Sequence, residues 1–230
     1  MGVSTLVPIV SCLVACANAH TRVNNPVKDI TGTQINCNVN GATAIPQTLE
    51  VPSGATFEFE WYHDVRGDDT IAAVTASPFP QRSRSSVIAS ASSNGNGAVW
   101  AKIASEGLSG GTWAVDKLIA NKGCHGLTIP AWIAPGEYLI RAEIIGLHEA
   151  DVAYASNSAR GAQFYPSCTQ IKVTCSGTTI PGQNFGFVGG YTYADPGITY
   201  SLYKLPTIDP YTAPGPTVWS PSLKAKRFEV

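Results

Sequence analysis

The stretch PGEYLIRAEIIGLH, residues 135–148, decides the fold predicted for this chain of 230 residues. The turn signal APG at residues 134–136 precedes it, and residues 138–147 then form the clearest strand candidate of the sequence. A second long strand is predicted over residues 163–174, which are rich in β-branched side chains towards their end.

Shorter strand candidates lie on either side of these two. Residues 56–61, TFEFEW, alternate in polarity, which places the three aromatic side chains on one face of a strand. Residues 99–103 and 112–118 are further candidates, and no long helical periodicity occurs. Short strands between Gly, Pro and Asn clusters predict an all-β sandwich with long loops.

Two regions are predicted to be irregular. Residues 74–96 are rich in Ser, Ala and Arg, and residues 191–219 form a long loop that Pro and Tyr keep ordered. Residues 220–230 are expected to be a loose tail. No Ser/Thr/Pro linker leads to a second module, so we expect one domain over residues 20–219.

Charge is sparse along the chain. Charged residues make up 13% of the sequence and the net charge is −1. Such a chain has no electrostatic footprint for nucleic acid or for an anionic membrane. We therefore expect neither partner, and we expect a monomer.

The N-terminus has the pattern of a secretory signal. Residues 6–17 are apolar but too short to span a bilayer, and ANA at residues 17–19 is a cleavage site. We expect a signal peptide at residues 1–19 and an extracellular protein; the alternative is a short buried segment. Cleavage leaves His20 first, whose amine and imidazole suit copper, although a histidine there is more often accidental.

The cysteines leave the disulfide pairing open. Cys12 and Cys16 depart with the signal peptide. The remaining four allow three pairings, between which spacing does not choose: Cys37, Cys124, Cys168 and Cys175.

Several segments together carry a resemblance to a known family: residues 57–61, 113–116, 135–148, 161–168, 195–198 and 214–216. They resemble auxiliary activity family 9, formerly glycoside hydrolase family 61. The resemblance implies an immunoglobulin/fibronectin-like β-sandwich that is secreted and binds one copper ion. It also implies oxidation of cellulose, β-glucan or another plant cell-wall polysaccharide at C1 or C4, with an external electron donor.

The same resemblance assigns roles to single residues. His20 matches the N-terminal copper ligand and Tyr165 the axial one, while His148 and Gln163 match residues that assist oxygen activation. Gln163 and Tyr165 are two apart on a strand and so share a face, but Tyr165 as a core residue and Gln163 as a surface amide are the plainer readings.

The resemblance also implies a pairing and a substrate surface. Cys37 and Cys168 match a disulfide of the family. Three loop tyrosines are candidates for a platform on which sugar rings stack, with ordinary loop packing as the alternative: Tyr191, Tyr193 and Tyr211.

The chain departs from the family in two places. The second copper histidine is missing, because its position falls near Thr75, and neither His63 nor His125 is placed to replace it. The segment between His20 and Cys37 is compressed, so the first strand is expected to be absent and a sheet edge exposed.

Three explanations of these departures compete: a faulty gene model, a subgroup that lacks an intact copper site, and a working enzyme with an unusual site. Residues 66–69, 113–123 and 160–162 resemble that subgroup, although its first residue is Arg. The leading hypothesis is a copper monooxygenase. The rivals are a non-catalytic glycan-binding protein and a copper carrier, whereas Glu58 and Glu60, alternating on a strand, do not indicate a glycosidase.

Overall fold

The computed structural model describes residues 18–22, 26–39, 41, 46–62, 82–90, 94–175, 177–182, 184–203 and 211–221. For residues 18–22 and 82–90 the description covers the backbone alone. No helix in these ranges is long and apolar enough to cross a membrane.

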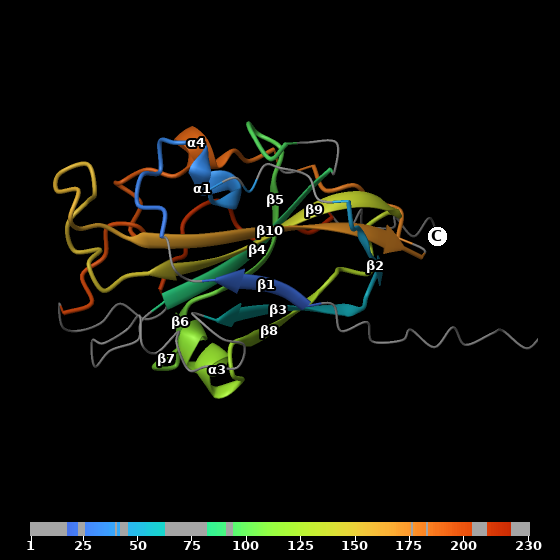
Figure 1. The fold of residues 1–230 in the computed structure, drawn as a ribbon, viewed down its shortest axis with the longest axis horizontal. Helices are drawn as coiled ribbons and strands as arrows, with labels where there is room; N and C mark the ends of the chain where they lie inside the picture. Colours follow the sequence, from blue (N-terminus) through green and yellow to red (C-terminus); the bar gives the residue numbers. More distant parts are fainter. Residues whose placement is uncertain are drawn as a thin grey trace, which may run out of the picture.

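A five-stranded sheet forms one layer of the molecule (Figure 1). Its strands, in spatial order, are β2 (Leu49–Pro52), β10 (Gln163–Thr174), β9 (Gly136–Gly146), β4 (Arg82–Ser90) and β5 (Ala101–Glu106). β9 and β10 pair antiparallel along most of their length, and β2 adds in parallel. The two long strands expected from the sequence are therefore the centre of the fold.

A three-stranded sheet forms the second layer. β3 (Thr56–Tyr62) lies between β1 (Asn18–Arg22), which runs parallel to it, and the antiparallel β8 (Cys124–Thr128). Of residues 21–36, where the first strand was expected to be missing, only Thr21 and Arg22 belong to β1, and they pair with Trp61 and Tyr62 of β3. A hairpin of β6 (Leu108–Ser109) and β7 (Thr112–Trp113) stands apart from both sheets.

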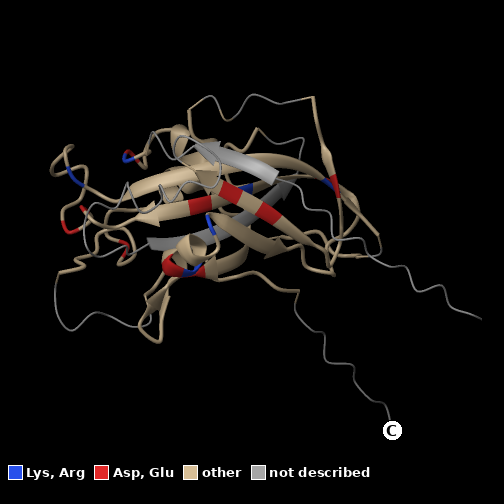
Figure 2. Cartoon of the chain, turned by 60° about the horizontal axis from the view of Figure 1, so that its bottom comes forward, with Lys and Arg blue, Asp and Glu red and all other residues tan. Residues whose placement is uncertain are grey.

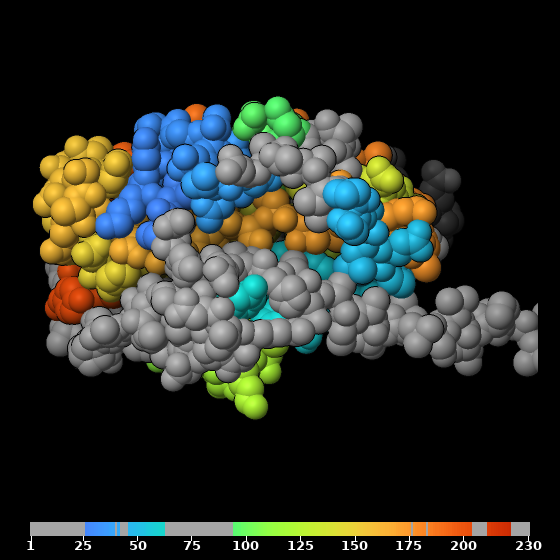
Figure 3. Space-filling model, viewed as in Figure 1, coloured from blue at the N-terminus to red at the C-terminus, as the bar shows by residue number. Residues whose placement is uncertain are grey.

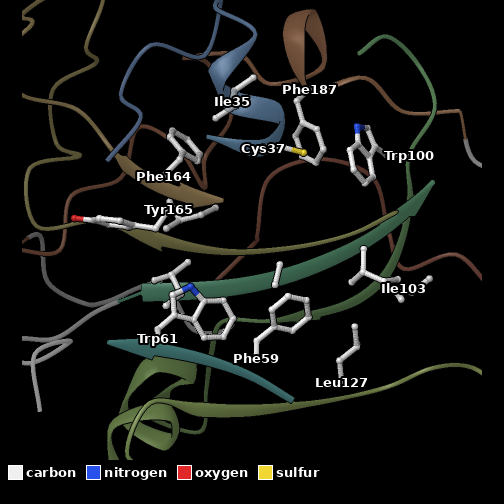
Figure 4. Close-up of a cluster of buried hydrophobic side chains, with 14 of the residues drawn as sticks. Ile35, Cys37, Phe59, Trp61, Trp100, Ile103, Leu127, Phe164, Tyr165 and Phe187 are labelled. Carbon is white, nitrogen blue, oxygen red and sulfur yellow. The ribbon is translucent and has the colours of Figure 1, made fainter. Parts of the chain in front are cut away.

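Part of the core lies between the two layers, and Figure 4 shows another part, with Ile35, Phe164 and Phe187, on the outer side of the five-stranded sheet. Phe57, Phe59 and Trp61 of β3 are at most 1% exposed, as their alternation predicts. Figure 4 shows Phe59 and Trp61 pointing from β3 towards the other sheet. This two-layer arrangement confirms the predicted immunoglobulin-like β-sandwich.

β4 corrects the prediction that residues 74–96 are irregular. It is an inner strand, bonded to β9 on one side and β5 on the other. Serine and arginine make up two thirds of its sequence, RSRSSVIAS, which therefore has little strand signal. Pairing on both sides, which no local pattern reveals, makes it a strand.

The prediction of a strand over residues 112–118 is also corrected. These residues contain the two residues of β7 and then the start of helix α3 (Ala114–Ala120). The Asp116 carboxylate accepts the Trp113 backbone N–H at 3.0 Å, which caps the first turn, and AVDKLIA consists mostly of good helix formers. The other helices among the described residues are one turn each: α1 (Gln34–Cys37) and α4 (Phe187–Gly190).

One disulfide ties α1 to the long strand β10. It joins Cys37 to Cys168, as the resemblance implied, with 131 residues of separation in the sequence. Neither Cys124 nor Cys175 forms a disulfide in the described part of the chain, and Cys175 is exposed.

A buried charged cluster lies on the outer side of β9, beneath α1 and α4. Arg141 and Glu143 are fully buried and 2.5 Å apart, and Arg141 also donates to the carbonyl of Asn36 at 2.6 Å. Glu143 accepts the Tyr191 hydroxyl at 2.9 Å. Burial lowers the pKa of nearby Lys102 to about 8, although the negative charge of Glu143 opposes that shift.

Candidate active site

The candidate site lies at one end of the β9–β10 pair. Gln163 is the first residue of β10 and pairs with Gly146, the last residue of β9. His148 follows two residues after β9 ends. Figures 1 and 3 show the yellow-orange segment after β9 at this end of the sandwich, beside the blue residues of the N-terminal segment.

Side chains on β10 alternate between two environments. Phe164 faces the side of β10 on which Tyr191 packs, with ring centroids 5.6 Å apart. Gln163 and Tyr165 share the opposite face, as their spacing predicts. They are 8% and 2% exposed, and Figure 4 shows the Tyr165 hydroxyl pointing away from the other labelled side chains.

Hydrogen bonds join the three predicted residues into one network. The Tyr165 hydroxyl donates to Gln163 Oε1 at 2.7 Å. Gln163 Nε2 is 3.0 Å from His148 Nε2 and 3.0 Å from Glu149 Oε2. A short chain of polar groups therefore runs from a buried phenol to a partly exposed imidazole.

The network continues into an ion pair that the sequence analysis missed. Lys28 Nζ lies 3.0 Å from Glu149 Oε2. Partial burial raises the pKa of Glu149, but the hydrogen bond and charge of Lys28, then Gln163 and His148, outweigh it and hold the pKa below its usual value. The carboxylate is therefore ionised at neutral pH.

The predicted copper donors are only partly described. The backbone of His20 lies on β1 opposite Glu60, and the structure does not describe its side chain. His63 and Thr75 lie outside the described residues. His125 lies on β8, opposite Phe59 of β3. Across the described ranges, no group of three His, Cys, Asp or Glu is arranged to hold a metal ion.

The predicted tyrosine platform fits poorly with the burial of its members. Tyr191 is 3% and Tyr211 7% exposed, and the Tyr211 hydroxyl donates to the Gly197 carbonyl. Their burial leaves no broad ring face for a sugar, which argues against a platform role for these two. Tyr193 is half-buried, so part of its ring remains accessible.

An exposed tyrosine lies beside the network instead. Tyr203 is 57% exposed and its hydroxyl donates to the His148 carbonyl at 3.4 Å. It belongs to the Tyr- and Pro-rich stretch that the sequence singled out, but composition did not distinguish it from its buried neighbours. Only its position against His148 marks it as part of the site.

Comparison of the sequence with protein-family models identifies the family of this chain. The model of Auxiliary Activity family 9, formerly GH61, matches residues 10–211. The chain belongs to this family.

Similar proteins agree with this assignment. The chain is 42% identical to AA9 family lytic polysaccharide monooxygenase A of Schizophyllum commune, over 92% of this chain and 94% of that protein. It is 46% identical to the enzyme of the same name from Armillaria gallica, over 86% and 76%. Among solved structures, CvAA9A superposes with a TM-score of 0.79 at 41% identity, covering 88% of each chain.

Proposed function

We propose that this chain is a secreted AA9 monooxygenase that oxidises cellulose or a related β-glucan at C1 or C4. The observation that carries the proposal is the Tyr165–Gln163–His148 network in an AA9 fold. The network holds an imidazole at the surface and connects it to a buried phenol. Such a fixed set of polar groups is suited to hold and orient small oxygen species next to a glycan.

Copper binding is the weak part of the proposed site. The AA9 family is copper-dependent, but the donors of this chain fit the ion only in part. The sequence has four histidines, one of which, His148, is bonded to Gln163. His20 would supply two strong copper ligands, its amine and its imidazole, and the Tyr165 phenol would supply a weak one. Because the second histidine is missing, we expect reduced copper affinity and slow turnover.

Substrate contact is assigned to the surface around the network. Charged residues are few in the described part of the fold (Figure 2) and make up 13% of the sequence, which suits a neutral polysaccharide better than a charged polymer. Tyr203 offers an exposed ring beside His148, and an aromatic face suits the C–H surface of a sugar. An external reductant is the expected electron source.

Release of oxidised oligosaccharides from cellulose tests the proposal. With copper and a reductant, the chain beginning at His20 should produce them, and a chelator should stop their release. Replacing His148 with alanine should lower the rate about 100-fold, the scale on which a positioned acid–base group acts. His125→Ala, on β8, should leave it unchanged. Equal rates for both variants would contradict the assigned role of His148.

A non-catalytic glycan-binding protein is the second candidate function. The missing second copper histidine favours it, because a site with one strong ligand residue loses the geometry that redox chemistry needs. This candidate predicts retention of the chain on cellulose without any oxidised product. The same assay therefore separates the two functions.

A further inference from the structure

Every polar atom of the Gln163 amide has a partner. Its Oε1 accepts the Tyr165 hydroxyl at 2.7 Å. Its Nε2, which carries two hydrogens, lies 3.0 Å from Glu149 Oε2 and 3.0 Å from His148 Nε2. Each of the two hydrogens on Nε2 therefore has an oxygen or nitrogen atom within hydrogen-bond distance, around a side chain that is 8% exposed.

Glu149 decides which way this amide faces. An ionised carboxylate accepts hydrogen bonds and donates none. If the amide were reversed, Gln163 Oε1 would face the Glu149 oxygens, and two acceptors would be in contact without a proton between them. The orientation with Nε2 towards Glu149 is the one that leaves no buried group unsatisfied.

Lys28 fixes Glu149 in place. Its ammonium donates to Glu149 Oε2 and to the Ala159 carbonyl, both at 3.0 Å. The residue before it, Val27, exchanges both backbone hydrogen bonds with Phe164 at 2.8 Å, and Phe164 adjoins Gln163. The positions of the ammonium and the amide are thus set by one backbone pairing.

We propose that Glu149, held by Lys28, is a positioning residue that fixes the Gln163 amide and thereby keeps His148 as the neutral tautomer protonated at Nδ1. With the amide fixed, its second N–H donates to His148 Nε2, which must then carry a lone pair. The imidazole therefore receives a hydrogen bond at Nε2 from the protein. The importance of this tautomer for turnover rests on the proposed function, whereas the orientation itself does not.

The tautomer is measurable in the copper-free, ¹⁵N-labelled chain by long-range ¹H–¹⁵N correlation, at a pH where His148 is neutral. His148→Ala identifies its signals among the four histidines. In the wild type the Nδ1–H form should exceed the Nε2–H form about tenfold, the scale of one well-made hydrogen bond. In Glu149→Gln the excess should fall to about twofold, because a neutral amide accepts either orientation of Gln163.

Two further variants test whether the change in tautomer ratio is specific to the Lys28–Glu149 pair. Glu50 pairs with Lys172 at 2.7 Å on the exposed β2–β10 edge, so Glu50→Gln removes an ion pair away from the network and should leave the ratio unchanged. Lys28→Met should shift the ratio in the direction of Glu149→Gln. An Nε2–H tautomer in the wild type, or an unchanged ratio in Glu149→Gln, would overturn the proposal.

Failure of the proposed function leads to a different result. If the chain released no oxidised sugar but the ratios followed these expectations, the positioning role would stand and the monooxygenase assignment would fall. If oxidised sugar appeared and Glu149→Gln altered neither the tautomer ratio nor the rate, the positioning role alone would be refuted.

Discussion

Replacing both Cys37 and Cys168 with alanine is expected to lower the free energy of unfolding by about 5 kcal/mol. The disulfide closes a loop of 131 residues between α1 and β10, and a loop of this length removes much of the conformational freedom of the unfolded chain. A loss of this size is comparable with the whole stability of many domains. Urea denaturation of the oxidised wild type and the double variant measures it.

The exposed Cys175 provides the control for this change. Cys175→Ala alters no disulfide and should change the free energy of unfolding by less than about 0.5 kcal/mol. A double variant at Cys37 and Cys168 that loses no more than Cys175→Ala would contradict the expected role of the disulfide.

Replacing Arg141 with methionine is expected to lower the free energy of unfolding by about 3–5 kcal/mol. The change leaves the buried Glu143 carboxylate without the cation 2.5 Å away. It also removes the donors to the carbonyls of Ile35 and Asn36 and the guanidinium 3.8 Å above the Phe187 ring. Denaturant unfolding at neutral pH is the measurement.

A second variant separates charge from packing. Arg141→Met with Glu143→Gln removes the buried carboxylate together with the guanidinium and keeps an acceptor for the Tyr191 hydroxyl, so it should recover part of the loss. A double variant as unstable as Arg141→Met alone would mean that lost packing and hydrogen bonds, rather than the buried negative charge of Glu143, cause the effect.

The sequence predicts the strands whose side chains face two different environments. β3, β9 and β10 follow from alternation and β-branched content, because in each of them one face enters the core. β4 does not, because its serines and arginines pair through the backbone with β9 and β5. The sequence also did not predict the helix α3, because a short apolar run is compatible with either a strand or a helix.

The part of the candidate site that could be predicted lies on β10 and just after β9, the strand with which β10 pairs. Gln163 and Tyr165 share a face of β10, and His148 is close because β9 and β10 are paired. Lys28 was not predictable, because 121 residues separate it from Glu149. The burial of Tyr191 was not either, since composition does not say which aromatic rings of a loop turn inwards.

Copper binding through His20 is the claim on which the proposed function rests, and calorimetric titration tests it most directly. The chain beginning at His20 should bind one copper ion through the His20 amine and imidazole. Adding one residue before His20, or replacing it with alanine, should abolish that binding. Absence of binding by the unmodified chain, or binding that survives both changes, would contradict the account.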